Sequence, residues 1–499
     1  MIGYPIVFII KLYRLRGMKP RRRPKEEKRD SPPFGTPIAQ RPVASHGKLF
    51  ILNLLESFLF VSLNREQYHF SIQAFLQLIV EILLNFSYHA AILFQKAALI
   101  KRTINMSKIM PTYFNQMPVS FEYGRGAWLW DQHGNQYLDS LSGIAVCGLG
   151  HAHPDVTRTI VEQAGKVLHT SNTFLIAKQI ELAEKLTQAA GMEQAYFCNS
   201  GAEANEAAIK LARLYARKKN IAAPIIITMR NSFHGRSMAT LSASGTERIQ
   251  QGFEPLVKDF IYVNLNDISE FDEVAKKYHD NIIAVMLEPI QGDGGIQIAS
   301  DEYLSHLRKY CDEQDLLLIL DEVQTGVGRT GKWFAHQHTA IKPDIMTVAK
   351  ALGNGVPIGA CLVRGKACNL FGPGKHGTTF GGNPFVCAVG CAVLDTMQKD
   401  NVLNNATVIG EYLKNKLKTV LSKHPGFVEV RGKGLMIGVE LDRNAMELTA
   451  IGLKHKLLFN ITANKVVRLL PPLIITEAEA DEIVARLDTA LAEFFNKVN

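Results

Sequence analysis

The stretch AYFCNSGAEANEAAIKLARLYARKK, residues 195–219, is the part of the sequence that decides the fold class. It begins with a short apolar run of strand length that ends at Ser200 and Gly201. Its second part, AEANEAAIKLARLYARKK, has the pattern of a helix. A buried strand followed at once by a helix predicts a βα unit, the building block of a mostly parallel sheet.

The same alternation continues along the chain. Four more apolar runs of strand length are separated by helical stretches, namely PIIITM, IIAVMLEPI, LLLILD and DIMTVAK. WLWDQHGNQYLD predicts a hairpin that turns at residues 133–135, and FVEVRGKGLMIGVEL predicts a second antiparallel pair. Thr476 and Glu479 have the spacing of a capping box that opens a final amphipathic helix. We therefore expect an α/β fold, with a large domain around a central sheet and a smaller α+β domain.

The charge distribution and the cysteine content restrict the possible binding partners and the cellular compartment. The chain of 499 residues carries a formal charge of +9, but residues 1–105 hold 16 basic and 6 acidic residues and the rest hold 40 and 41. The part after residue 105 therefore has no basic excess for binding nucleic acid. Seven cysteines form no CxxC pair, which favours reduced, buried cysteines and a cytoplasmic location.

Residues 1–105 differ from everything after them. Two apolar runs within them, LFILNLLESFLFVSL and QAFLQLIVEILLNFSY, would suit a membrane anchor, but Glu56 and Glu81 interrupt runs that are already short for a span. The arginine-rich stretch before them would suit a transit peptide, but it is followed by the acidic EEKRD. We expect this extension to be upstream sequence read through into the protein, with the true start near Met106.

Three strands end in polar residues, at the edge where open α/β sheets bind ligands. They end at Ser200, Asp321 and Lys350. Ser200 alone could be a helix cap and Asp321 a turn residue, but Lys350 is a charged residue at the end of a buried strand. Together the three suit pyridoxal 5'-phosphate, which needs an amine for its Schiff base, a carboxylate for its ring nitrogen and a cradle for its phosphate.

Seven sequence motifs, taken together, match those of a known enzyme family. SGAEANEAAIKLAR, NSFHGRSMATLSASG, EPIQGDGG, LDEVQTGVGRTG, TVAKALGNGVPIGA, HGTTFGGNP and VVRLLPP occur in this order. Over roughly residues 112–499 the chain resembles the class III (ornithine-type) pyridoxal-phosphate aminotransferases, and within them the acetylornithine group. This resemblance implies a fold-type I homodimer with active sites at the subunit interface. It implies a small domain built from residues 106–165 and 396–499, a large cofactor-binding domain from 166–395, and an extension over 1–105.

The resemblance also implies roles for individual residues. Lys350 would form the Schiff base and Asp321 would pair with the ring nitrogen. Arg236 would bind the substrate α-carboxylate and Arg468 a carboxylate of 2-oxoglutarate or glutamate. Phe233 would stack on the ring, Gln324 would lie near the ring hydroxyl, Ser200, Gly201 and Ala202 would hold the phosphate, and Thr379 would reach the phosphate from the other subunit. His151 and His153 have metal-like spacing, but they match the family's GHxHP turn, so we expect no metal.

Three positions depart from the family pattern. Asp293 stands where the family has the glutamate that masks the arginine matching Arg468. Aspartate is one methylene shorter, so this gate is expected to be weaker or bridged by water. Cys147 stands where the acetylornithine group commonly has asparagine. Ile144 stands where true ornithine aminotransferases have a substrate-binding tyrosine, which favours an acylated ornithine over free ornithine.

The function implied is transamination between N2-acetylornithine and 2-oxoglutarate, which belongs to arginine biosynthesis run in the reverse direction. N-succinyl-diaminopimelate and succinylornithine are further substrates compatible with the resemblance. A 4-aminobutyrate or ornithine aminotransferase is the alternative, and a mutase or decarboxylase on the same scaffold is a weaker one. An alternative of another class is a membrane-associated or purely binding protein that keeps the fold without turnover, against which the intact Lys350 and Asp321 argue.

Overall fold

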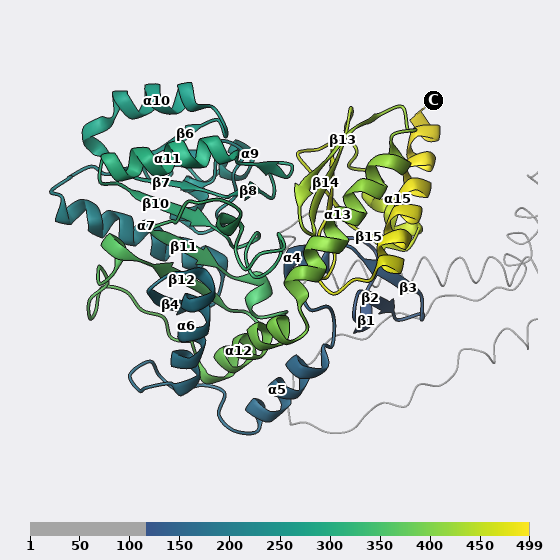
Figure 1. Ribbon diagram of the computed structural model, residues 1–499, viewed down its shortest axis with the longest axis horizontal. Coiled ribbons are helices and arrows are strands. Elements are labelled where there is room, and N and C mark those ends of the chain that lie inside the picture. The colour runs from purple at the N-terminus through teal and green to yellow at the C-terminus, as the bar shows by residue number, and fades with distance from the viewer. Residues whose placement is uncertain (1–115, 499) are drawn as a thin grey trace, which may run out of the picture. The chain divides into compact units, whose positions relative to one another are not determined.

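The structure is a computed structural model, and the residues it describes are 116–498. Its central feature is a seven-stranded sheet with the strand order β4-β12-β11-β10-β7-β5-β6 (Figure 1). Within this sheet β12 runs antiparallel to both of its neighbours, and the remaining neighbours pair in parallel. The mostly parallel sheet predicted from the sequence is confirmed. Its strands are β4 (Gln194–Cys198), β5 (Ile225–Met229), β6 (Phe260–Val263), β7 (Ile282–Leu287), β10 (Leu317–Asp321), β11 (Ile345–Val348) and β12 (Gly359–Val363).

Helices cover both faces of this sheet. The alanine-rich face of α7 (Gly201–Lys218) packs on one face, and α10 (Ile268–Lys277) and α11 (Asp301–Glu313) pack on the other (Figure 1). All six residues of β7 are buried as a result. Burial on both faces explains why these strands are continuous apolar runs rather than alternating ones.

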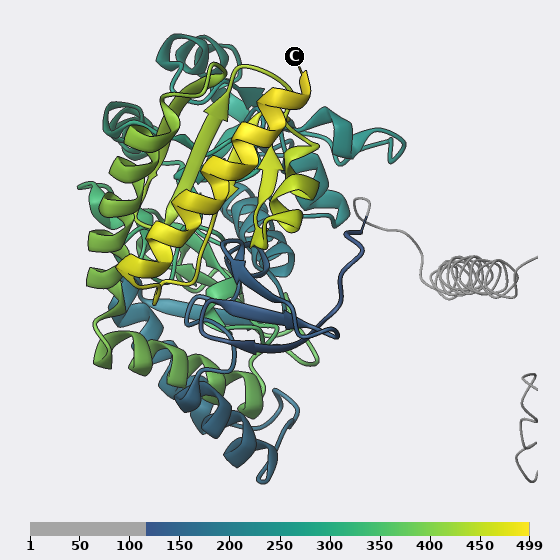
Figure 2. The same ribbon diagram turned by 90° about the vertical axis from the view of Figure 1, so that its right-hand side faces the viewer.

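A second sheet belongs to the C-terminal part of the chain. Its order is β13-β14-β17-β16, and α13 and α15 pack together beside it (Figure 2). The Thr476 N–H donates to Glu479 Oε2 at 2.8 Å and the Glu479 N–H donates to Thr476 Oγ1 at 3.2 Å, which confirms the capping box before α15. The elements are β13 (Phe427–Lys433), β14 (Met436–Leu441), β16 (Asn460–Thr462), β17 (Val466–Leu469), α13 (Val402–Leu421) and α15 (Glu477–Val498).

A third sheet joins the N-terminal and C-terminal parts of the chain. The antiparallel strands β1 (Phe121–Arg125), β2 (Trp128–Asp131) and β3 (Gln136–Asp139) continue in β15 (Leu457–Leu458), which pairs in parallel with β3. The predicted hairpin between β2 and β3 is confirmed. The two ends of the described residues thus share one sheet, while the smaller domain built from both parts, with boundaries at 165/166 and 395/396, stays a prediction.

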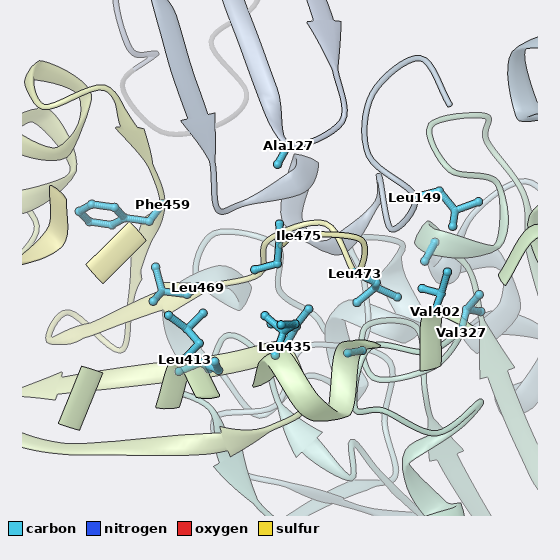
Figure 3. Packing of buried hydrophobic residues seen from close by; sticks show 14 of the residues in the cluster. Ala127, Leu149, Val327, Val402, Leu413, Leu435, Phe459, Leu469, Leu473 and Ile475 are labelled. Atoms are coloured by element: carbon cyan, nitrogen blue, oxygen red, sulfur yellow. The ribbon is translucent and has the colours of Figure 1, made fainter. Parts of the chain in front are cut away.

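One apolar core runs through the junction of these sheets. The cluster takes in Ala127 and Leu149 from the N-terminal segment together with Leu435, Leu469 and Ile475 from the C-terminal part, and Figure 3 shows these side chains. Helix α12 packs against α5 and α6, and α6 also packs against β4 (Figure 1). The remaining helices and strands are α5 (Pro154–Ala164), α6 (Ala177–Ala190), α8 (Met238–Ala243), α9 (Glu247–Gln250), α12 (Pro384–Lys399), α14 (Leu448–Lys454), β8 (Ile290–Gln291) and β9 (Gln297–Ile298).

The turn α4 (Ser142–Ala145) has a conformation that the sequence did not reveal. The φ angles of its four residues lie between 45° and 66°, so the chain makes a single left-handed turn. L-residues disfavour this region, and tertiary hydrogen bonds hold it. The Ser142 hydroxyl donates to the Leu470 carbonyl at 2.6 Å, and the Ser142 N–H donates to Asp139 Oδ1 at 2.8 Å.

Two expectations concern the environment of the protein. All seven cysteines are unpaired, and five of them are buried as expected, whereas Cys147 and Cys368 are partly exposed. In the part of the chain that the structure describes, no helix is long and apolar enough to cross a membrane. The apolar runs for which a membrane anchor was considered lie outside the described residues.

Candidate active site

A cavity of about 440 Å³ lies at the carboxyl ends of the central strands. This volume falls in the range of small-molecule sites. Its wall includes the three residues that the sequence places at strand ends, Ser200 after β4, Asp321 in β10 and Lys350 after β11. The fold therefore brings together the amine, the carboxylate and the helix start that pyridoxal phosphate would need.

Lys350 sits at an unusual backbone position. Its φ is +48°, a region in which a non-glycine residue is strained. Strained residues of this kind are found preferentially at functional sites. Burial lowers the pKa of the Lys350 amine, and the charge of Arg468 lowers it further, against the opposing carboxylates of Asp293, Asp321 and Glu288. The neutral, nucleophilic form of the amine is therefore favoured.

Asp321 is held by hydrogen bonds from three segments. The Asn205 side-chain amide donates to Asp321 Oδ2 at 2.7 Å, and His234 Nδ1 lies 2.8 Å from the same oxygen. The Val323 N–H donates to Oδ1 at 3.0 Å. Burial opposes the charged form of His234, but the hydrogen bond to Asp321 raises its pKa. This network fixes the carboxylate in one orientation at the floor of the cavity.

The start of α7 forms the cradle expected for a phosphate. The Ser200 hydroxyl accepts the Glu203 N–H at 3.2 Å, which confirms Ser200 as the N-cap. The first N–H groups of a helix have no acceptor within it, so those of Gly201 and Ala202 are available at the cavity that both residues line. A Cβ at Gly201 would lie 2.6 Å from Val323 Cγ1, so only glycine lets the loop after β10 approach the helix start this closely.

Phe233, Arg236 and Gln324 also line the cavity. The Arg236 guanidinium carbon lies 5.5 Å from the centroid of the Phe233 ring, a distance at which the cation and the ring attract each other. Gln324 follows Asp321 in the loop after β10, and its Oε1 lies 3.4 Å from Arg468 Nη1. The residues proposed to contact the ring and those proposed to contact substrate carboxylates are thus neighbours.

Asp293 and Arg468 form a direct ion pair. Arg468 Nη1 donates to Asp293 Oδ1 at 2.8 Å, and Arg468 Nε donates to Asn460 Oδ1 at 3.1 Å. Arg468 is buried in β17, whereas the Asp293 side chain is 40% exposed. The shorter aspartate therefore reaches the arginine without a bridging water, although its exposure leaves the pair open to solvent.

Three of the expected site residues lie outside the cavity wall. Arg468 lies behind the wall and hydrogen-bonds Asp293 and Gln324, which line the cavity. Ile144 packs in an apolar cluster with Ile290 and Leu470. Thr379 is exposed on the loop before α12.

The histidines with metal-like spacing have protein partners. His151 Nε2 lies 2.8 Å from Asp139 Oδ2. His153 caps α5 by accepting the Asp155 N–H at 3.3 Å. Among residues 116–498, no group of three or more histidine, cysteine or acidic side chains is arranged to hold a metal ion.

Sequence reasoning missed three polar residues of this site, Asn205, His234 and Glu288. Each is almost fully buried and lines the cavity. A signal for Asn205 was present, because it is a polar residue among the alanines on the inner face of α7. The Thr347 hydroxyl donates to its Oδ1 at 2.7 Å, which orients the amide toward Asp321.

Comparisons with known proteins agree with this geometry. The family model of class-III aminotransferases matches residues 109–491. The acetylornithine aminotransferase of Nitrosomonas europaea is 49% identical over 389 residues, which cover 78% of this chain and 98% of that protein. The acetylornithine aminotransferase of Caldanaerobacter subterraneus is 47% identical over 393 residues, covering 78% and 99%.

Solved structures give the same result. The N-acetylornithine aminotransferase of Stenotrophomonas maltophilia matches with a TM-score of 0.68 and 37% identity, covering 79% of this chain and all of that one. The ornithine aminotransferase of Toxoplasma gondii matches with a TM-score of 0.76 and 30% identity, covering 80% and 96%. A second structure of the Toxoplasma enzyme has pyridoxal phosphate at partial occupancy in its active site. By its sequence and by its fold, this chain belongs to the class-III aminotransferase family.

Proposed function

We propose that this protein is a pyridoxal-phosphate-dependent aminotransferase that acts on N2-acetylornithine and 2-oxoglutarate. The products are N-acetylglutamate 5-semialdehyde and glutamate, and arginine biosynthesis uses the step in reverse. The observation that carries the proposal is that Lys350, Asp321 and the start of α7 line the same cavity. The substrate is supported by relatives that are 44–49% identical and carry the name acetylornithine aminotransferase.

The residues of the cavity fit pyridoxal 5'-phosphate. Lys350 offers an amine of lowered pKa, and Asp321 offers a carboxylate whose orientation is fixed by hydrogen bonds. In the described part of the chain, His234 Nε2 is buried without a hydrogen-bond partner beside that carboxylate. The N–H groups of Gly201 and Ala202 would hold the phosphate at the positive end of α7. Phe233 would stack on the ring, and Gln324 would lie near its hydroxyl.

The chemistry divides between the group and the chain. When bound, pyridoxal phosphate supplies a ring that withdraws electrons from the substrate carbon. Asp321 would hold the proton on the ring nitrogen and so keep the ring electron-poor. The Lys350 amine would take a proton from the substrate carbon and give that proton up again later in the reaction. Burial lowers the pKa of this amine, so it is neutral and able to accept a proton more often than the amine of an exposed lysine.

Two arginines would bind the substrates. Arg236 lies in the cavity wall and would bind the α-carboxylate of the amine donor. Arg468 would bind a carboxylate of 2-oxoglutarate after displacing Asp293. A guanidinium can bind a carboxylate through two parallel hydrogen bonds, so two arginines suit a dicarboxylate.

Substrate choice is tested by comparing kcat/KM for a set of amine donors with 2-oxoglutarate as the acceptor. N2-acetylornithine should exceed ornithine and 4-aminobutyrate by at least about tenfold, and N-succinyl-diaminopimelate and succinylornithine belong in the same series. The structural similarity to the Toxoplasma ornithine aminotransferase makes ornithine the second candidate. A higher kcat/KM for ornithine or 4-aminobutyrate would overturn the proposed substrate and leave the aminotransferase chemistry intact.

We also propose that the protein is a homodimer in which Thr379 completes the partner's phosphate site. Two loops that touch each other expose apolar side chains. Asn172 donates to the carbonyls of Thr378 and Gly381, and the rings of His169 and Phe380 lie 5.4 Å apart. Around these contacts Leu168, Phe174, Leu175 and Phe380 are each more than half exposed. A patch of this kind is typical of an interaction surface.

Mixing two inactive variants tests the contribution of Thr379. Lys350→Ala and Thr379→Ala subunits are purified separately, dissociated and reassociated together. If Thr379 acts across the interface, a mixed dimer holds one site with both changes and one with neither, so activity returns to about a quarter of wild type. Activity that stays at the level of the two parents would show that Thr379 acts within its own subunit.

The proposed location is the cytoplasm, and the unpaired state of all seven cysteines supports a reducing compartment. Fractionation of cells that express residues 1–499 tests this. A stable integral-membrane pool would contradict it.

A further inference from the structure

Glu288 is a buried acid in the cavity wall that the proposed chemistry does not use. It follows β7 directly and is 5% exposed. Asp321 ends the neighbouring strand β10, so the two carboxyl groups lie at the same edge of the sheet. A carboxyl group is costly to bury unless its oxygens accept hydrogen bonds. The donors that satisfy the Glu288 oxygens therefore indicate its role.

Each oxygen of Glu288 accepts a backbone N–H from a different loop. The Phe233 N–H donates to Oε2 at 3.0 Å, and the Gly292 N–H donates to Oε1 at 3.1 Å. Phe233 belongs to the loop after β5, and Gly292 belongs to the turn between β8 and β9. The two loops are far apart in the sequence, and this one carboxyl group links them.

Both loops carry the groups that would contact cofactor and substrate. The first loop presents the Phe233 ring and the Arg236 guanidinium to the cavity. In the second loop, Gly292 precedes Asp293, the partner of Arg468. A Cβ at Gly292 would lie 2.5 Å from Gln324 Oε1, so the backbone there also rests against the Gln324 amide.

We propose that Glu288 is a positioning residue that fixes the two carboxylate-binding ends of the active site relative to each other through these two hydrogen bonds. This inference rests on the proposed function, because it assigns substrate carboxylates to Arg236 and Arg468. The ionised form of Glu288 satisfies both N–H groups with full acceptor strength. Protonation of one oxygen weakens one of the two bonds and loosens the loop attached to it.

The surroundings of Glu288 set the pH at which its carboxylate is protonated. Burial raises the pKa of Glu288 to about 7; His234 opposes the rise and Asp321 adds to it. Lys350, whose amine is favoured in its neutral form, is the third titratable group that interacts with it. We therefore expect the loops to be held more firmly at pH 8 than at pH 6.

The test uses the full chain loaded with pyridoxal phosphate and the variants Glu288→Gln and Glu288→Asp. The apparent Kd of each substrate is measured in its separate half-reaction from the absorbance of the bound cofactor, at pH 6 and pH 8. Glu288→Gln should weaken both substrates about tenfold at pH 8, as expected for one lost hydrogen bond to a charged group. It should also abolish the difference between the two pH values that the wild type shows.

Glu288→Asp keeps the charge but cannot span both N–H groups. It should weaken both substrates and keep the pH difference, so the predicted loss of affinity can still be measured if Glu288→Gln fails to fold. Visible circular dichroism of the bound cofactor provides a readout without turnover, and its amplitude should fall in both variants because Phe233 is no longer fixed. The matched control is Glu273→Gln, on the exposed face of α10.

Two results separate the ways in which this inference can fail. A folded Glu288→Gln variant that binds both substrates like the wild type, with the same pH difference, would overturn the role of Glu288 alone. A wild-type chain that takes up no pyridoxal phosphate would overturn the proposed function on which the inference rests.

Discussion

Replacing Asp293 with alanine should make the protein bind 2-oxoglutarate more tightly. Asp293 Oδ1 accepts a hydrogen bond from Arg468 Nη1 at 2.8 Å. A dicarboxylate that binds Arg468 must therefore first displace the Asp293 carboxylate. Without Asp293, Arg468 keeps hydrogen bonds to the neutral oxygens of Asn460 and Gln324. A buried guanidinium left without a counter-ion gains more from an incoming carboxylate than one that is already paired.

The magnitude follows from the exposure of the two partners. Arg468 is 2% exposed and Asp293 is 40% exposed. Exposed ion pairs contribute about 0.2–1 kcal/mol, and breaking a buried pair costs about 3–5 kcal/mol. A half-exposed pair lies between these limits, and about 1.4 kcal/mol corresponds to a tenfold lower Kd for 2-oxoglutarate.

The assay titrates each substrate in its own half-reaction and follows the absorbance of the bound cofactor. Asp293→Ala should bind 2-oxoglutarate about tenfold more tightly than wild type and discriminate less between 2-oxoglutarate and N2-acetylornithine. Asp293→Glu restores a carboxylate at this position and serves as the control, with a Kd near the wild-type value or above it. An unchanged or higher Kd for 2-oxoglutarate in Asp293→Ala would refute the view that this carboxylate masks Arg468.

Three further predictions test the chemistry and the fold. Lys350→Ala should lower turnover by at least about 10³-fold and shift the visible absorbance of the bound cofactor, because both the covalent link and the proton carrier are lost; steady-state rates and a spectrum check this. Thr476→Ala should lower the free energy of unfolding by about 1 kcal/mol in urea titrations, because the cap of α15 is lost. Although burial opposes it, the hydrogen bond to Asp139 raises the pKa of His151 to about 9. Its contribution to stability, at most about 3 kcal/mol, should be complete below pH 6.5 and lost as pH rises through 9, and His151→Asn should flatten that slope in urea titrations.

The sequence predicted those parts of the site that have a local signal. Ser200 stands between an apolar strand and an alanine-rich helix, so its role as a cap followed from its neighbours alone. Lys350 attracted attention because a charge at the end of a buried strand needs an explanation. In both cases the evidence lay within a few residues along the chain.

The parts that the sequence missed depend on long-range contacts. Nothing in SGIA predicts a left-handed turn at residues 142–145, where the Ser142 hydroxyl donates to the distant Leu470 carbonyl. Glu288 looked like one residue of a family motif until the structure placed the Phe233 and Gly292 N–H groups on its two oxygens.

The most direct test of the proposed function is the visible absorbance of the purified chain before and after addition of N2-acetylornithine without a keto acid. We expect a yellow protein that bleaches with N2-acetylornithine and regains its colour with 2-oxoglutarate, because each substrate drives one half-reaction. A yellow protein that does not respond to N2-acetylornithine would contradict the proposed substrate. A protein that stays colourless with added pyridoxal phosphate would contradict the assignment of Lys350.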